Sequence, residues 1–138
     1  MNAPPHRGGP ARREDPPLVL VVEDDKGVRE LLEIVLSGEG FEVHTARDGL
    51  EGLLKVRMLD PAALVLDIMM PDIGGLRVLD QLAAEHAGTP VIVVTGAAEA
   101  ADVARERLGK ANVFVKPFDI DLLVERIRAV ASSPGATS

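Results

Sequence analysis

Short apolar runs alternate with longer amphipathic segments along the chain. The runs cover residues 18–22, 41–46, 63–67, 91–95 and 112–116. Most consist of Val, Leu and Ile without polar alternation, which is typical of strands that are buried on both faces. Each run is followed by a segment whose apolar residues have helical spacing. We therefore predict a three-layer α/β fold, a doubly wound (βα)5 parallel sheet with helices on both faces.

Capping residues and apolar spacing define the helices. Asp25 and Asp48 stand where an N-cap is needed after the first and second runs, because a short acidic side chain can accept a hydrogen bond from a free amide of the first turn. The helix after the fourth run is Ala-rich and is expected to bury less than the others. In the last helix the apolar residues are expected to share one face. The apolar residues of the helices after the first, second, third and fifth runs are, in this order, Val28, Leu31, Leu32, Val35 and Leu36; Leu50, Leu53, Leu54 and Val56; Leu76, Leu79 and Leu82; and Leu122, Leu123, Ile127 and Val130.

The two ends of the chain differ in composition from its centre. Residues 1–16 are rich in Pro, Gly and Arg and are predicted to form a disordered arm. Residues 17–131 are expected to form one folded domain, and residues 132–138 a flexible tail or the start of a linker. This pattern suits a stand-alone domain and also part of a longer protein with an output domain.

The composition excludes several classes of function. The chain contains no Cys, which rules out disulfides, thiolate metal sites and Cys nucleophiles. Its net charge of −7 opposes binding to a nucleic-acid backbone, and the near absence of aromatic residues opposes base stacking. No apolar run is long enough to cross a bilayer, and the N-terminus does not have the apolar core of a signal peptide. We expect a cytoplasmic domain that binds neither nucleic acid nor membrane.

Polar side chains stand at the carboxyl ends of four of the five predicted strands. These residues are Glu23, Asp24 and Asp25 after the first run, then Asp67, Thr95 and Lys116 at the ends of the third, fourth and fifth. Because a parallel sheet presents its strand ends along one edge, where ligands bind, we expect these side chains to meet there. A single acid after a strand is usually a turn or a helix cap, but this many polar groups in register indicate a site.

The residue types in this set favour phosphoryl transfer. Clustered carboxylates repel one another unless a cation neutralises them, and oxygen ligands without His or Cys favour a hard ion, which we predict to be Mg²⁺. Lys116 and Thr95 supply a positive charge and a hydroxyl for the oxygens of a phosphoryl group. Asp67 is then the nucleophile, which would form an aspartyl phosphate.

Several motifs, in order and spacing, resemble those of the response-regulator receiver domain of two-component signalling. They read "VLVVEDD", "LVLDIMMPDIGGL", "VIVVTGAA" and "VFVKPF", and the resemblance covers about residues 18–131. It implies a flavodoxin-like fold with strand order 2-1-3-4-5 and a phosphorylation-activated switch that catalyses only its own phosphorylation and dephosphorylation. It also implies a sensor histidine kinase or histidine phosphotransfer protein as phosphodonor, and a downstream effector protein as partner.

The resemblance assigns metal ligands among the predicted site residues. Asp24 and Asp67 would ligate Mg²⁺ directly, and Glu23 would act through water. The main-chain carbonyl of Met69 would be a further ligand. Asp25 remains the cap of the first helix.

The resemblance also assigns the residues of the switch. Asp67 would be the phospho-acceptor, Thr95 the hydroxyl that moves onto the phosphoryl group, and Lys116 the lysine that pairs with it. A cis peptide before Pro117, as in the family, would direct Lys116 inward.

Two departures from the family pattern concern signal output. The family usually has Tyr or Phe three positions before the lysine, where this chain has Val113, while Phe114 is expected to point to the opposite face of the strand. The usual acids before this strand are replaced by "GKAN" at residues 109–112. A phosphorylation-dependent homodimer through the fourth helix, fifth strand and fifth helix stays open, although its usual charge partners are missing.

Met69 and Ala97 bear on the lifetime of the phosphorylated state. In the family, the residues two positions after the phospho-acceptor and two after the threonine influence hydrolysis. Neither Met69 nor Ala97 can orient a water molecule by a side-chain hydrogen bond. We therefore predict slow intrinsic dephosphorylation, over minutes to hours.

Three alternatives share parts of this pattern. A phosphatase of the haloacid-dehalogenase type would need an acid two residues after its nucleophile, where this chain has Met69. A flavodoxin-like flavin carrier would need a Ser/Thr-rich phosphate loop after the first strand, and aromatic residues around the ring. A degenerate receiver that only docks partner proteins would not need the complete set of acids, Thr95 and Lys116.

Overall fold

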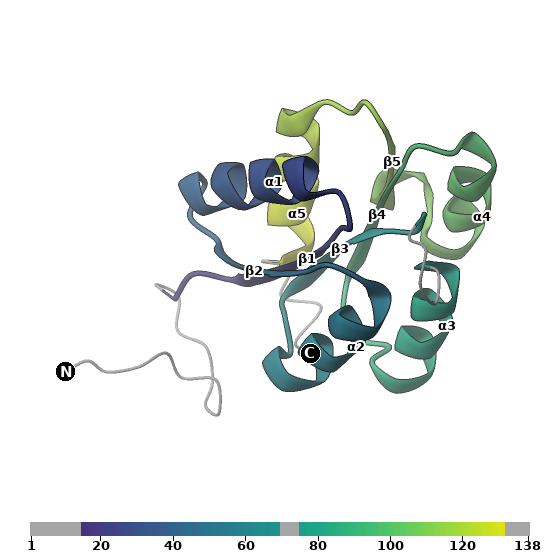
Figure 1. Ribbon diagram of the computed structural model, residues 1–138, viewed down its shortest axis with the longest axis horizontal. Coiled ribbons are helices and arrows are strands. Elements are labelled where there is room, and N and C mark those ends of the chain that lie inside the picture. Colours follow the sequence, from purple (N-terminus) through teal and green to yellow (C-terminus); the bar gives the residue numbers. More distant parts are fainter. Residues whose placement is uncertain (1–14, 70–74, 132–138) are drawn as a thin grey trace.

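The computed structural model describes residues 15–69 and 75–131, which build a parallel sheet between two helical layers (Figure 1). The strands are β1 (Leu18–Val22), β2 (Glu42–Ala46), β3 (Ala63–Asp67), β4 (Val91–Thr95) and β5 (Val113–Val115). They pair in parallel in the order β2-β1-β3-β4-β5. This order confirms the predicted flavodoxin-like sheet. The predicted N-terminal arm, except its last two residues, and the predicted C-terminal tail lie outside the described residues.

Helices cover both faces of this sheet. They are α1 (Lys26–Gly38), α2 (Gly49–Leu59), α3 (Gly75–Glu85), α4 (Ala98–Leu108), a 3₁₀ turn η1 (Lys110–Asn112) and α5 (Ile120–Ala131). Helices α1 and α5 cover one face, and α2, α3 and α4 cover the other. The two predicted caps are confirmed: the carboxylate of Asp25 accepts a hydrogen bond from the amide of Val28, and that of Asp48 from the amide of Glu51.

The central strands explain the unbroken apolar runs. Every residue of β1 and β3 is buried. Successive side chains of a strand point to opposite faces, so Leu20 and Val22 join the core beneath α2, α3 and α4, whereas Val19 and Val21 join the core beneath α1 and α5. Two apolar layers therefore need apolar residues at every strand position.

Two strands are shorter than predicted. The amide of Phe41 donates to the carbonyl of Leu36 at 3.2 Å, so Phe41 still belongs to the turn that ends α1, and β2 begins at Glu42. The amide of Asn112 donates to the carbonyl of Gly109 at 3.2 Å, which closes η1 before β5 begins. In these two predicted runs the first residue, Phe41 or Asn112, therefore belongs to a turn and not to the strand.

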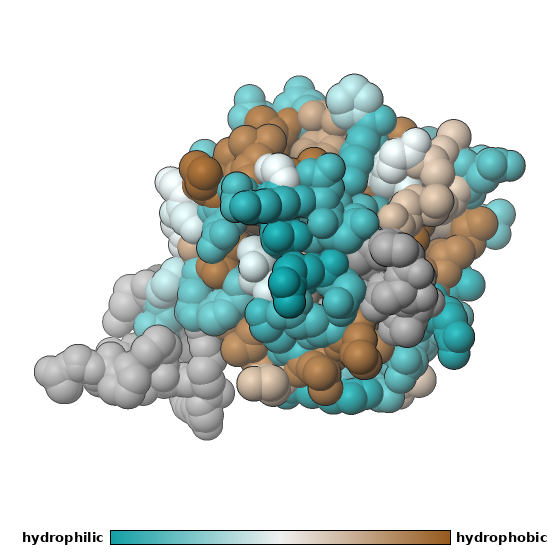
Figure 2. Space-filling view, viewed as in Figure 1, coloured by the Kyte–Doolittle hydropathy of each residue, from teal (hydrophilic) through white to brown (hydrophobic). Residues whose placement is uncertain are grey.

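Some helical leucines face away from the sheet. The side chains of Leu31, Leu50, Leu54 and Leu122 are 54%, 59%, 48% and 55% exposed. The prediction that Leu122 shares a face with Leu123 is wrong, because adjacent helical residues lie about 100° apart and Leu123 occupies the position against the sheet. Hydrophobic patches over α1 and along the lower rim of the molecule, where α2 lies, are visible in Figure 2.

Gly52 allows α2 to lie close to β1. A Cβ atom at Gly52 would lie 2.9 Å from Cγ2 of Val22, and Val22 is fixed in the centre of the sheet between β2 and β3. We expect Gly52→Ala to lower the free energy of unfolding by about 1–3 kcal/mol, because overpacking outweighs the better helix propensity of Ala. Urea unfolding measures this change.

Gly38→Ala is the matched control, because no atom lies within 4 Å of a Cβ built at Gly38. Removing backbone freedom from the unfolded chain should leave this variant unchanged or more stable by up to about 1 kcal/mol. Equal stabilities of the two variants would show that α2 can move away from β1 at no cost.

Candidate metal centre

Strand register brings the predicted site residues to one edge of the sheet. Val22 pairs with Leu66, Asp67 with Val94, and Thr95 with Val115. Because the strands are parallel and in this register, the residues that follow β1 and β5 lie beside the last residues of β3 and β4. The predicted convergence at the carboxyl edge is therefore confirmed.

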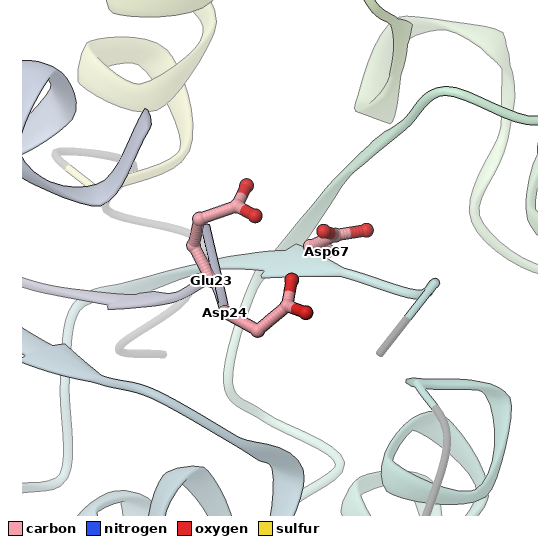
Figure 3. A group of neighbouring side chains, drawn as sticks. All are labelled: Glu23, Asp24 and Asp67. Carbon is pink, nitrogen blue, oxygen red and sulfur yellow. The ribbon is translucent and has the colours of Figure 1, made fainter. Parts of the chain in front are cut away.

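Three carboxylates form the centre of this edge. One oxygen each of Glu23, Asp24 and Asp67 lie within 4.8 Å of one another. Figure 3 shows the Glu23 and Asp24 side chains, directly after β1, reaching toward the space beside Asp67 at the end of β3. Glu23 and Asp67 are buried, whereas Asp24 is exposed to solvent. The cluster is therefore open on the side of Asp24.

Lys116, which follows the edge strand β5, contacts two of these acids. Its Nζ lies 3.0 Å from Oε1 of Glu23 and 3.3 Å from Oδ2 of Asp67. The peptide between Lys116 and Pro117 is cis, as predicted. The two distances place the ammonium group of Lys116 between the two buried acids.

The buried acids have an unfavourable electrostatic environment without a further cation. Burial, together with the hydrogen bond and charge of Asp67, raises the pKa of the Glu23 carboxyl to about 7, although hydrogen bonds from Lys116 and the amide of Asp25 act in the opposite direction. Partial burial lowers the pKa of Lys116, but its hydrogen bond to Glu23 and the charge of Asp67 outweigh this effect, so the pKa is raised. One ammonium therefore does not fully neutralise the site.

The donor set fits Mg²⁺. Its ligand atoms are carboxylate oxygens, which this hard ion prefers, and its exposed side leaves room for the water molecules that Mg²⁺ usually retains. Burial first, and the neighbouring Asp67 second, raise the pKa of Glu23, and a divalent ion would stabilise its ionised form against both effects. Glu23, Asp24 and Asp67 are the side chains that could hold it.

Thr95 ends β4, the strand that pairs with the end of β3, and Met69 follows Asp67 by two residues. Thr95 is fully buried at the end of β4, and its hydroxyl accepts a hydrogen bond from the amide of Ala97 at 3.2 Å. The amide of Met69 donates to Oδ1 of Asp67 at 2.9 Å, while the Met69 side chain is 56% exposed. Met69 therefore contacts Asp67 through its main chain and leaves its thioether in solvent.

The β5 strand has the side-chain directions that its sequence predicts. Val113 packs in the core shared with α4, and Phe114 lies in the opposite core. There the Phe114 ring meets Phe118 edge-on, with 6.5 Å between ring centroids. The face of β5 that looks toward α4 consequently has a Val where the family usually has an aromatic ring.

Sequence reasoning did not single out Arg29. Its Nη1 donates to the main-chain carbonyls of Glu23 and Asp24, at 3.0 Å and 3.4 Å. Helical side chains point back toward the helix N-terminus, so an Arg four residues after the cap Asp25 can reach the β1–α1 corner. That spacing was the only sequence signal for this contact.

Comparisons with known proteins agree with this geometry. A family model of the response regulator receiver domain matches residues 19–128. The probable transcriptional regulatory protein TcrX of Mycobacterium tuberculosis is 37% identical over 134 residues, which are 92% of this chain and 56% of TcrX. The response regulator MprA of Mycobacterium leprae is 41% identical over 81% of this chain and 50% of its own length. This chain therefore spans about half the length of the curated relatives it matches.

Solved structures show the same fold. A receiver domain protein from Methanospirillum hungatei superposes with a TM-score of 0.79 at 27% identity, over 89% of this chain and 99% of that one. The response regulator TrrA of Thermotoga maritima, solved in complex with Mg²⁺ and BeF, has a TM-score of 0.75 at 31% identity, over 83% and 98%. In residues 15–69 and 75–131, no helix has the length and apolar character to span a membrane. The chain belongs to the response regulator receiver domain family, the switch modules of two-component signalling.

Proposed function

We propose that this chain accepts a phosphoryl group on Asp67 and thereby changes the surface it offers to a partner protein. The observation that carries the proposal is the position of the buried Asp67 carboxylate, with the ammonium of Lys116 3.3 Å away and the carboxylates of Glu23 and Asp24 beside it. An acid that served only as a turn or cap would not need this surrounding.

The transfer is a displacement at phosphorus. An oxygen of the Asp67 carboxylate forms a bond to phosphorus while the P–N bond to the imidazole of a phosphohistidine breaks. The imidazole keeps the electron pair and takes a proton from solvent. The acyl phosphate that results is an anhydride, and its extra negative charge lies next to Lys116, which can pair with a phosphoryl oxygen.

Glu23, Asp24 and Asp67, with the main-chain carbonyl of Met69, would hold Mg²⁺. When bound, this ion supplies positive charge that stabilises the oxygens of a transferring phosphoryl group. Glu23 also accepts from the amide of Asp25 at 3.2 Å through its second oxygen, so one side chain connects Lys116 to the β1–α1 corner. Glu23 thereby fixes the distance between the cation and the metal-binding acids.

The response to phosphorylation starts at Thr95. Its hydroxyl, which accepts a hydrogen bond from the amide of Ala97, would donate one to a phosphoryl oxygen and so pull the β4–α4 connection toward Asp67. Helix α4 packs against the sheet through the small residues Ala101 and Ala104, so its shift involves little apolar surface. With Val113 in place of an aromatic ring, we propose that output depends on α4 itself.

The proposal places this switch in residues 17–131. The phosphodonor is a sensor histidine kinase or histidine phosphotransfer protein, and the effector is another protein that binds the activated form. The net charge of −7 opposes direct nucleic-acid binding by this domain. A phosphorylation-dependent homodimer is the alternative; Arg126 of α5 is held within the chain by a 2.8 Å hydrogen bond to Asn112, so a homodimer through this face would have to release it.

Labelling with a small acyl phosphate tests the proposal. We expect stoichiometric addition of one phosphoryl group in the presence of Mg²⁺, measured by intact-protein mass spectrometry, and none after the metal is removed with EDTA. Labelling that persists in EDTA would contradict the metal dependence. Absence of labelling under both conditions would favour a degenerate receiver that only docks partners.

Mg²⁺ affinity should depend on pH through Glu23. The pKa of this carboxyl is about 7 in the folded protein against 4.5 for an ordinary Glu, so below about pH 7 Mg²⁺ has to displace a proton. We expect affinity to fall as pH falls below 7, by up to about tenfold per pH unit. Calorimetric titrations at about pH 6 and about pH 8 measure it.

The same shift makes the metal-free protein less stable as pH rises. Between pH 4.5 and about 7 the folded state holds a proton on Glu23 that the unfolded state has lost, so the stability from the neutral carboxyl is lost as pH rises through 7. Glu23→Gln should flatten both profiles. Glu30→Gln on the exposed face of α1 is the control and should retain them.

A further inference from the structure

Arg29 is the fourth residue of α1, and its guanidinium group turns back to the corner between β1 and α1. Nη1 donates to the carbonyl of Glu23 at 3.0 Å and to the carbonyl of Asp24 at 3.4 Å. Both carbonyls belong to residues of the carboxylate cluster. Arg29 therefore contacts the main chain of two of the three acids and does not need to touch their carboxylates.

Three other hydrogen bonds of this corner act on groups that the Arg29 side chain does not contact. The Asp25 carboxylate caps the amide of Val28 at 3.0 Å, and the amide of Arg29 donates to the carbonyl of Asp25 at 2.9 Å. These two bonds fix Asp25 and the start of the helix. The amide of Glu23 donates to Ala46 on β2 at 3.0 Å, which fixes the end of the strand. The Arg29 side chain holds both peptide groups between strand and helix through their carbonyls, and the second is also held by the Asp25 amide, which donates to Oε2 of Glu23 at 3.2 Å.

Orientation of these peptides decides where the acids point. The rotamers open to a side chain depend on the φ and ψ angles of its own residue, so a changed peptide orientation at Glu23 or Asp24 changes the directions that its carboxylate can take. Asp24 is the more sensitive of the two, because it is exposed to solvent whereas Glu23 is buried. Glu23 is held in addition by Lys116.

We propose that Arg29 is a positioning residue for the metal centre, acting through the main chain of Glu23 and Asp24. The inference rests on the proposed Mg²⁺ site. Mg²⁺ tolerates little deviation from octahedral geometry at about 2.0–2.1 Å, so a carboxylate that loses its fixed direction binds it less well. Groups that orient metal ligands typically change metal affinity by about 10–100-fold.

A purely electrostatic role of Arg29 has the opposite sign. A guanidinium close to the cluster repels a divalent cation, so removing its charge without any loss of positioning would tighten Mg²⁺ binding. The charge effect is screened, because this edge of the site is open to solvent and salt. Positioning should therefore dominate, and the direction of the affinity change distinguishes the two roles.

The test is a calorimetric Mg²⁺ titration of the full chain and of three variants. We expect Arg29→Gln to weaken Mg²⁺ binding about tenfold and Arg29→Lys to weaken it less, because an ammonium can retain a bond to one carbonyl. Arg105→Gln is the control: Arg105 pairs with Asp102 on the exposed side of α4, at 2.9 Å and away from the cluster. It removes the same charge and should leave the affinity unchanged.

Thermal unfolding without Mg²⁺ separates positioning from general stability. A merely structural Arg29 would lower the melting temperature of Arg29→Gln and leave the Mg²⁺ affinity of the folded fraction at the wild-type value, which would overturn the inference. Tighter binding by Arg29→Gln would overturn it too. If Arg29→Gln does not fold, Arg29→Lys decides by the same criterion. A wild-type chain that binds no Mg²⁺ would instead refute the proposed metal site itself.

Discussion

Asp67→Asn should abolish labelling by a small acyl phosphate. The side-chain amide that replaces the carboxylate has no anionic oxygen to attack phosphorus, and it removes one of the three acids that would bind Mg²⁺. The substitution keeps the shape of the side chain, and Oδ1 can still accept from the amide of Met69. The fold should therefore persist, and intact-protein mass spectrometry should show no added phosphoryl group.

Asp60→Asn is the matched control for this variant. Asp60 is exposed at the end of α2 with φ of 48°, a conformation that Asn tolerates as well as Asp does. The control makes the same chemical change far from the site and should label fully. Stoichiometric labelling of Asp67→Asn would falsify the assignment of the phospho-acceptor, and mapping the label would identify the residue that carries it.

The sheet could be predicted from the sequence because its physical requirement is simple. Strands buried on both faces need apolar residues at each position, and β1 meets this requirement over its full predicted length, while β3 and β4 meet it up to their last residues, Asp67 and Thr95. The first residues of β2 and β5 could not be predicted as well, because single turn hydrogen bonds of Phe41 and Asn112 decide where these strands begin. The exposure of leucines such as Leu50 could not be predicted either, because the pattern records that a residue is apolar but not which way its side chain points.

The convergence of the polar residues followed from topology. Parallel strands bring their ends to one edge whatever the loops do, so Asp67, Thr95 and Lys116 could be grouped before any distance was known. Two features of the site depend on distances and could not be predicted from the order of the strands. One is the complete burial of Glu23 beside exposed Asp24; the other is the reach of Arg29 to main-chain carbonyls, which any residue type offers equally.

The phosphoryl group on Asp67 should persist for minutes to hours in the absence of a phosphatase. Hydrolysis requires a water molecule held in line behind phosphorus, and a positioned hydrogen-bonding or basic group is what usually holds it. Met69 is 56% exposed as a residue, and its thioether is a weak acceptor without a proton to donate. Ala97 presents a methyl group, and its amide already donates to Thr95.

Following the label after removal of the phosphodonor measures this lifetime. Met69→Gln adds an amide that can both donate to and accept from water beside Asp67, and we expect it to speed the loss by about tenfold, a modest effect for a positioned polar group. Met58→Gln is the control, since Met58 is 77% exposed near the end of α2, which leads to the start of β3 and not to the carboxyl ends of the strands. Its label should decay at the wild-type rate.

Each outcome of this time course has a definite meaning. If the wild-type label disappears within seconds, some group other than these two side chains orients the water, and the slow switch is wrong. If the label is long-lived and Met69→Gln does not shorten it, the exposed side chain at 69 does not reach the attacking water. A long lifetime that the Met69 variant shortens would mean that this chain holds its activated state until a partner removes the phosphoryl group, because its own residues give hydrolysis little help.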